Sequence, residues 1–299
     1  MRTTVIGSYP LKFDELGPEA VRQAVEEQIA AGMQLVTDGQ TRGDMISVYA
    51  GVLKGTELKA EKGSPGGERK LHITGKVELG DPSMFVEDFL LAKKVAGGRA
   101  EVKTALTGPM TLAFSSIIDT KLYKGYRDRA LYSDISGALH GIARALERAG
   151  ATRLQVDEPY FSVGVPMELA RPAVEAIATG FKGEVALHAC GDVSKVFDSL
   201  LAFRGIRMLS HGFAGNPGNL GLLSREKLEK AGKLLGFGCI DTASERVETE
   251  KEVLGLLKKG ADAVGAENMV AHPDCGLRVL PLEVARRKLR VLGEAARRV

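Results

Sequence analysis

Eight short runs rich in aliphatic and β-branched residues recur along this chain, and amphipathic helical patterns separate most of them. The runs cover residues 3–7, 34–38, 101–107, 153–157, 184–188, 206–210, 234–240 and 269–272. Helical periodicity covers residues 19–31, 171–179, 194–202, 226–231, 245–259 and 282–296. Eight β/α alternations in 299 residues favour a (β/α)8 TIM barrel, an α/β fold, over a doubly wound sheet.

One segment interrupts this alternation. Residues 52–80 predict a β-hairpin excursion after the second strand, with Gly-Ser-Pro-Gly-Gly at residues 63–67 as its turn. No internal repeat, low-complexity stretch or linker divides the sequence. We therefore expect a single domain over residues 1–299, built on one barrel.

Charge and composition argue against several classes of partner. The formal net charge is +3, and Lys and Arg are scattered among Asp and Glu, so we expect no nucleic-acid or membrane partner. The first residues contain no apolar signal-peptide core, and no apolar run approaches the roughly 20 residues of a spanning helix. The three cysteines are widely spaced, which is typical of a reducing compartment. These features predict a cytoplasmic protein.

Polar side chains gather at the C-terminal ends of the predicted strands. In chain order they are Ser8, Asp38, Gln40, Thr107, Asp157, Glu158, His188, Cys190, His211, Asp241, Asp274 and Cys275. In a barrel of parallel strands these ends converge on one face, which carries the active site in enzymes of this fold. We therefore expect His188 and Cys275 to be neighbours in space despite their distance in the sequence.

The sequence His188-Ala-Cys190 is typical of metal ligation. Two residues that lie two positions apart on an extended strand point to the same side. With the thiolate of Cys275 they form an N/S donor set of the kind that selects zinc. Such a set, without a further Cys or a nearby HxxxH pair, favours a catalytic site with an open position. The alternative is that both cysteines are small buried apolar residues and His188 is a hydrogen-bonded core histidine.

Six segments, in order along almost the whole chain, resemble a known family. They are Val-Ile-Gly-Ser-Tyr-Pro (5–10), Leu-Val-Thr-Asp-Gly-Gln-Thr-Arg-Gly-Asp-Met (35–45), Leu-Thr-Gly-Pro-Met (106–110), Leu-Gln-Val-Asp-Glu-Pro (154–159), Leu-His-Ala-Cys (187–190) and His-Pro-Asp-Cys-Gly-Leu (272–277). The ordered set resembles the C-terminal catalytic barrel of cobalamin-independent methionine synthase, and more closely the short archaeal-type "core" form without the N-terminal barrel. The resemblance implies a methyltransferase that converts L-homocysteine to methionine.

The resemblance also implies residues that bind the substrate. Ile6 and Ser8 match the segment that holds the carboxylate of the amino acid, and Asp157 matches a carboxylate that binds its ammonium group. Gln40 stands where the family has a substrate-binding Glu, and Asp157 and Asp241 are the expected catalytic carboxylates. A zwitterionic substrate independently requires such groups. The alternatives are a strand-end cap for Asp157, a turn-capping hydroxyl for Ser8 and a solvated loop amide for Gln40.

The zinc ligands implied by the resemblance are His188, Cys190 and Cys275, and zinc coordination deprotonates the thiol of homocysteine. The family's fourth ligand is a Glu at the end of the sixth strand, where this chain has His211 and no carboxylate. Because imidazole serves zinc well, His211 is the expected fourth ligand. The alternative is that water or Cys239 fills the position.

A second departure from the family concerns the methyl donor. Folate-using members carry Asp-Ile-His-Ser after the seventh strand, and that His resembles a shuttle that protonates the leaving folate nitrogen. This chain reads Asp-Thr-Ala-Ser over residues 241–244, so Ala243 replaces the His. Cobalt(I) leaves a corrinoid without a proton. We therefore expect a methylcorrinoid donor, either methylcobalamin or a corrinoid protein, and not methyl-folate.

Three other functions are compatible with parts of the pattern. A corrinoid-dependent methyltransferase acting on another thiol, such as coenzyme M, has no use for an ammonium-binding carboxylate at Asp157. A uroporphyrinogen decarboxylase-like barrel needs no metal ligands. A structural zinc or thiol-binding protein predicts a closed site with four ligands and no turnover.

Overall fold

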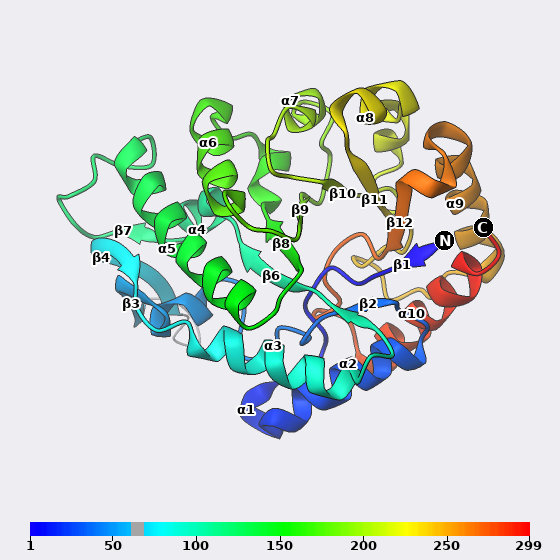
Figure 1. The fold of residues 1–299 in the computed structure, drawn as a ribbon, viewed down its shortest axis with the longest axis horizontal. Coiled ribbons are helices and arrows are strands. Elements are labelled where there is room, and N and C mark those ends of the chain that lie inside the picture. Colours follow the sequence, from blue (N-terminus) through cyan, green and yellow to red (C-terminus); the bar gives the residue numbers. More distant parts are fainter. Residues whose placement is uncertain (61–68) are drawn as a thin grey trace.

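A curled parallel sheet of short strands forms the centre of this computed structural model, which describes residues 1–60 and 69–299 (Figure 1). In spatial order the strands are β1 (Arg2–Thr3), β12 (Met269–His272), β11 (Leu234–Gly238), β10 (Met208–Gly212), β9 (Glu184–His188), β8 (Arg153–Asp157) and β6 (Thr104–Thr107). Most of their residues are buried, because the sheet is covered on both faces. The α/β class predicted from the alternating pattern is confirmed.

Two shorter strands lie between the edges of this sheet. β2 (Leu35–Val36) pairs in parallel with β5 (Glu101–Val102), and an isolated bridge joins Thr4 to Leu35. β5 and β6 together cover residues 101–107, which the sequence predicts as one strand. The chain therefore changes its strand partner from β2 to β8 within a segment that the sequence pattern indicates as one continuous run.

A separate small sheet lies at the left of Figure 1, away from β1 and β12. In it, β3 (Leu53–Ala60) runs antiparallel to β4 (Arg69–Leu79), and β7 (Ile117–Ile118) pairs with β4 in parallel. The turn that the sequence predicts at residues 63–67 lies outside the described residues.

Helices cover the outer face of the curled sheet (Figure 1). The α-helices of the described residues are α1 (Phe13–Leu16), α2 (Pro18–Ala30), α3 (Ser83–Ala96), α4 (Pro109–Phe114), α5 (Arg129–Arg148), α6 (Met167–Ala178), α7 (Phe197–Leu201), α8 (Arg225–Ala231), α9 (Glu250–Val264) and α10 (Leu282–Ala296). Short 3-10 helices are η1 (Ser47–Gly51), η2 (Pro159–Val163), η3 (Pro217–Leu222) and η4 (Ala266–Asn268). In the described part of the chain, none of the helices combines the length and the apolar character that crossing a membrane requires.

Four of these helices, α1, α3, α4 and α5, are not among the expected helical segments. The signal for α5 is nevertheless in the sequence, since Leu131, Ile135, Leu139, Ile142 and Leu146 recur at helical spacing and are all buried. The carboxylate of its N-cap residue, Asp128, accepts a hydrogen bond from Ala130 N.

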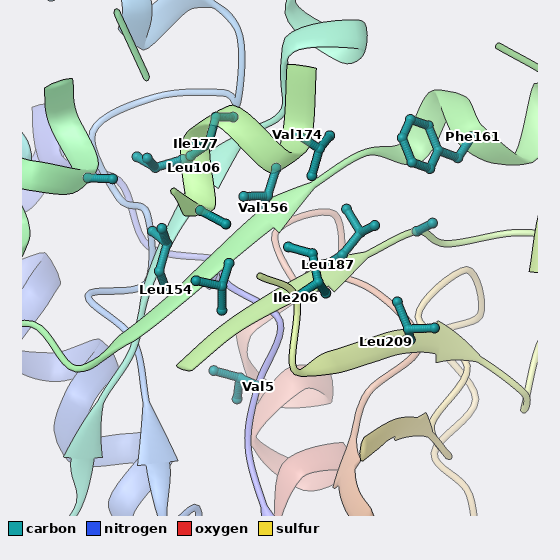
Figure 2. Packing of buried hydrophobic residues seen from close by; sticks show 14 of the residues in the cluster. Val5, Leu106, Leu154, Val156, Phe161, Val174, Ile177, Leu187, Ile206 and Leu209 are labelled. Atoms are coloured by element: carbon teal, nitrogen blue, oxygen red, sulfur yellow. The ribbon is translucent and has the colours of Figure 1, made fainter. Parts of the chain in front are cut away.

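The alternation of side chains along each strand decides which residues face the helices. Figure 2 shows Val156 of β8 beside Val174 and Ile177 of α6, within the buried apolar cluster. Because side chains alternate along a strand, Gln155 and Asp157 of β8 face the opposite, inner side of the curled sheet. The C-terminal ends of the strands therefore present polar groups inward and apolar groups to the helices.

Candidate active site

Three possible metal ligands from the ends of two strands, β9 and β12, meet at the C-terminal end of the sheet. His188 is the last residue of β9, Cys190 follows two positions later, and Cys275 lies in the loop after β12. The ligand atoms of these three residues all lie within 4.8 Å of one another. The structure thus brings together the two sequence segments that were expected to meet.

The chemistry of this cluster fits a zinc ion. Nε2 of His188 is buried and, within the described residues, has no hydrogen-bond partner. Burial opposes protonation of His188, but the adjacent Cys275 gives its pKa a net increase. A hydrogen bond from Cys275 lowers the pKa of Cys190, and the same bond raises the pKa of Cys275. One imidazole and two thiols form a donor set found in catalytic zinc sites, where a fourth position is open to substrate.

His211 does not join this cluster, which corrects its prediction as the fourth ligand. Its ring lies against Phe197 of α7, with 5.8 Å between ring centroids, and its Nδ1 is 3.0 Å from Ala189 O. The reason is the alternation along β10, which turns Ser210 toward His188 and the next residue, His211, to the helical side. Burial there lowers the pKa of His211 to about 4.

Cys239 is also separate from the cluster. Its side chain is buried and its Sγ lies 3.6 Å from His272 O. Burial raises the pKa of this thiol well above its usual value, so Cys239 behaves as a small apolar residue with a weak donor.

The cluster of His188, Cys190 and Cys275 opens into a cavity of about 400 Å³. Of the residues expected to bind the substrate, Ile6, Ser8, Gln40 and Asp157 all line this cavity together with His188, Cys190 and Cys275. The lining also includes apolar side chains, among them Met45, Val48, Met84, Phe85 and Val279. The lining of the cavity therefore combines polar and charged groups with apolar side chains.

Asp157 is a buried carboxylate in the lining of the cavity. Its Oδ1 accepts a hydrogen bond of 2.6 Å from Gln155 Nε2, and Gln155 Nε2 also donates to Ile6 O at 2.9 Å. Burial raises the pKa of Asp157, while His188, Gln155 and Lys103 act in the opposite direction. This arrangement leaves the second carboxylate oxygen available to a cationic group in the cavity.

Lys103 lies beneath Asp157, and the sequence patterns gave no indication of this role. Its Nζ donates to Val5 O at 2.5 Å and to Gln155 Oε1 at 2.6 Å. Burial lowers the pKa of Lys103 to about 7, and the charge of Asp157 opposes this shift. The signal that could have revealed it is a lysine inside a predicted strand, two positions before an apolar residue of the same face.

Ser8 and Gln40 are held at the cavity by close backbone contacts. Ser8 O accepts a hydrogen bond from Leu277 N at 2.8 Å, and a Cβ at Gly276 would collide with the Ser8 hydroxyl. Gln40 has a positive φ of 47°, and its side chain covers Gly7, where a Cβ would collide with it. Gly276 thus lets the Ser8 hydroxyl approach the loop that carries Cys275, and Gly7 lets the Gln40 side chain pack against the segment after β1.

Glu158, which the sequence placed among the polar strand-end residues, has a structural role. Its carboxylate accepts hydrogen bonds from Met110 N, Thr111 N and Thr111 Oγ1 at 2.7–2.9 Å, at the start of α4. A Cβ at Gly108 would collide with the same carboxylate. Full burial raises the pKa of Glu158 to about 7.

Asp241, expected to be catalytic, is not among the residues that line the cavity. Its Oδ1 accepts from Ala243 N at 2.9 Å, and its N–H donates to Glu248 Oε1 at 3.0 Å. Lys288 Nζ donates both to Asp241 O and to the Glu248 carboxylate, so a buried ion pair anchors this loop. The structure gives Asp241 a turn-closing position, whereas its neighbour Thr242 lines the cavity.

The model of one protein family matches most of the chain. This family, described as cobalamin-independent synthase, catalytic domain, matches residues 15–298. The chain belongs to this family. The resemblance found in the six sequence segments is therefore confirmed.

Individual relatives of this cobalamin-independent synthase domain agree. A methionine synthase of Methanothermobacter thermautotrophicus is 38% identical over 99% of this chain and 99% of its own length. A methionine synthase of Methanocaldococcus jannaschii is 33% identical with the same coverage. The structure of a B12-independent methionine synthase from Shewanella sp. W3-18-1, in complex with selenomethionine, has a TM-score of 0.83 at 26% identity, covering 99% of this chain and 96% of that one. The chain is thus a methyltransferase of the methionine synthase type.

The family description bears on the expected donor. A methylcorrinoid was expected because Ala243 replaces a proton-shuttling His, but the matched family is described as cobalamin-independent. The comparisons therefore give no support to the methylcorrinoid expectation. Ala243 itself is exposed in the loop after β11.

Proposed function

We propose that this chain is a zinc-dependent methyltransferase that methylates the thiol of L-homocysteine and gives methionine. The observation that carries the proposal is that His188, Cys190 and Cys275 open into the same cavity as the buried carboxylate of Asp157. A thiol-binding metal and an ammonium-binding carboxylate within one cavity match the two ends of a thiol amino acid. The names of the two relatives from Methanothermobacter thermautotrophicus and Methanocaldococcus jannaschii, both methionine synthases, support the same substrate.

The chain's own residues bind and orient the amino acid in this proposal. Asp157, fixed by Gln155, receives the ammonium group through a charge-assisted hydrogen bond. Ser8 and the backbone around Ile6 receive the carboxylate, and Gln40 supplies a further amide at the same wall of the cavity. The homocysteine side chain then extends toward the two thiols and His188.

Zinc, when bound, supplies a Lewis acid that keeps a thiol in its nucleophilic thiolate form at neutral pH. His188, Cys190 and Cys275 hold the ion at the end of the cavity, and burial of His188 keeps water from competing for Nε2. The apolar side chains of the cavity lining receive the methyl donor, so that its methyl group reaches the thiol of homocysteine in the same cavity.

The discriminating feature between homocysteine and other thiols is Asp157. Coenzyme M carries a sulfonate and no ammonium group, so its anionic end would meet the carboxylate of Asp157 in the cavity. This like-charge contact disfavours coenzyme M as the acceptor.

The proposal includes a closed (β/α)8 barrel over residues 1–299 as a single domain. Support comes from the bridge between Thr4 and Leu35 and from the pair of Leu35 with Glu101, which connect β1 to β5 through β2. β5 is followed directly by β6, which pairs with β8. A crystal structure in which β2 is detached from β1 would contradict this closure.

The experiment that tests the function measures methionine formation by the purified zinc-loaded protein. Homocysteine and coenzyme M are offered as acceptors, and methyl-folate and methylcobalamin are offered in parallel as donors. We expect methyl transfer to homocysteine and not to coenzyme M. Transfer to coenzyme M alone, or no transfer from either donor despite bound zinc, would overturn the proposal.

A further inference from the structure

A chain of hydrogen bonds runs from His188 across the sheet to the loop that carries Cys275. His188 Nδ1 lies 3.1 Å from Ser210 Oγ, and Ser210 Oγ lies 2.9 Å from His272 Nε2. His272 Nδ1 lies 2.7 Å from Pro273 O. The side chains of His188, Ser210 and His272 are 2%, 0% and 0% exposed, so water does not compete for these bonds.

The direction of each bond follows from the last acceptor. A carbonyl oxygen only accepts, so Pro273 O requires the proton of His272 to be on Nδ1. Nε2 of the neutral His272 then carries a lone pair, which the Ser210 hydroxyl meets as a donor. Ser210 Oγ in turn accepts from His188 Nδ1–H. Nε2 of His188 is left with the lone pair, and it is this atom that lacks a partner among the described residues.

The hydrogen bond between Ser210 and His272 depends on a glycine, Gly236, in the strand that lies between them. Ser210 is on β10 and His272 on β12, and β11 lies between them. Gly236 of β11 pairs with Ser210, and a Cβ there would come within 2.7 Å of His272 Nε2 and 2.8 Å of Ser210 Cβ. A glycine at this position therefore lets the hydroxyl reach the second imidazole across a strand.

We propose that Ser210 and His272 are positioning residues that hold His188 in the Nδ1–H tautomer and so present Nε2 to the metal. The tautomer of a histidine ligand is set by the bond that its other nitrogen makes. The bond between His188 Nδ1 and Ser210 Oγ depends on a second bond. His272 Nε2 accepts the hydroxyl proton of Ser210, and this orients the hydroxyl so that it accepts from His188. Because Pro273 is two residues before Cys275, the same chain connects the loop of one ligand to the ring of another.

This inference rests on the metal site of the proposed function, but its first test uses the metal-free protein. In protein labelled with 15N at its five histidines, long-range 1H–15N correlation spectra distinguish a protonated from an unprotonated ring nitrogen. Loss of one set of signals in His188→Gln and of another in His272→Gln assigns the rings. We expect Nδ1–H and a bare Nε2 for both His188 and His272. A spectrum with Nε2–H at His188 overturns the inference without any variant being needed.

The second test removes the hydroxyl. Ser210→Ala is expected to leave His188 as a mixture of tautomers and to weaken zinc binding by roughly 10–100-fold in competition with a chelator. Ser136→Ala is the matched control, because Ser136 Oγ is also buried and, within the described residues, has no hydrogen-bond partner. It should keep both the tautomer and the zinc affinity. A pure Nδ1–H tautomer with wild-type zinc affinity in Ser210→Ala would contradict the proposal.

Gly236→Ala disturbs the chain without changing any of its members. We expect the same mixture of tautomers at His188, with circular dichroism showing a folded protein. An NMR spectrum like that of the wild type would show that the bond across β11 is not needed.

Failure of the proposed function gives a different pattern. A protein with fixed tautomers and tight zinc binding that forms no methionine would overturn the methyltransferase proposal and leave this inference standing.

Discussion

Lys103, directly before β6, and Asp157, at the end of the neighbouring β8, share the side-chain amide of Gln155. The amide accepts a bond from the lysine ammonium group and donates one to the carboxylate, all three groups being buried. The ammonium group thereby stabilises the ionised form of Asp157 against the effect of burial, which raises its pKa. A carboxylate that binds an ammonium group has to be ionised and correctly oriented, and this arrangement favours both conditions.

Asp157→Asn should raise the KM for homocysteine by roughly 10-fold or more, on the roughly 1.5–3 kcal/mol expected of a charge-assisted hydrogen bond. The reason is that an amide retains the shape of the side chain but loses the charge that pairs with the ammonium group. Steady-state kinetics with varied homocysteine make the measurement, with the exposed Asp198→Asn as control. Unchanged KM and kcat would show that the amino acid binds elsewhere.

Lys103→Met should raise the KM for homocysteine more than it lowers kcat, because it removes a cation that favours the ionised form of Asp157 and the donor that orients Gln155. Lys233→Met is a matched control, since Lys233 is also buried and donates to two backbone carbonyls, Phe203 O and Ile206 O, whereas Lys103 also donates to Gln155 Oε1, next to Asp157. Both variants should lose stability, and only the first should change KM. Equal kinetic effects in the two variants would assign Lys103 a purely structural role.

Cys190→Ser and Cys275→Ser should each lose zinc and activity while the protein stays folded, starting from about one zinc per chain. The hydroxyl that replaces the thiol is a poor zinc ligand at neutral pH, and both positions are half-buried and outside the strands. Metal analysis after dialysis makes the measurement, and Cys239→Ala, which changes a thiol outside the cluster, should keep its zinc. Full zinc occupancy in both serine variants would refute the site.

His211→Asn should keep its zinc, because the His211 ring contacts Phe197 and Ala189 and not the cluster. It should lower the free energy of unfolding by roughly 1–3 kcal/mol, as expected for a buried polar group whose bond is disturbed. Zinc content and urea unfolding are measured on the same preparation. Loss of the metal at unchanged stability would restore His211 as a ligand.

Glu158→Gln should change how stability depends on pH. Burial raises the pKa of Glu158 from its usual 4.5 to about 7, so between these values the folded protein binds a proton that the unfolded chain has lost. This proton uptake contributes to the free energy of unfolding. The contribution, up to roughly 3 kcal/mol, is complete below pH 4.5 and is lost as the pH rises through about 7. Urea unfolding at pH 5 and pH 8 should show this fall in the wild type and a smaller fall in Glu158→Gln. Parallel pH profiles would mean that Glu158 is ionised throughout.

Local sequence patterns located much of the fold. The predicted bounds of β8, β9, β12 and α10 are those of the structure, because apolar periodicity and strand-end residues are local properties. The prediction for β10 is displaced by two residues, and the apolar pattern of α5 was overlooked although it is regular. Where a run changes its strand partner, as at residues 101–107, the pattern does not show the break.

The sequence by itself determined the family, because the order of the motifs is a property of the sequence. It also determined that His188 and Cys190 point to the same side, because they lie two positions apart. It did not determine which face of β10 is inward, and so His211 was assigned to the metal although Ser210 faces it. Nor did it indicate that Lys103 supports Asp157 or that Ser210 reaches His272 across Gly236. Those contacts depend on the register between strands, which the packing of the whole sheet fixes and no local periodicity specifies.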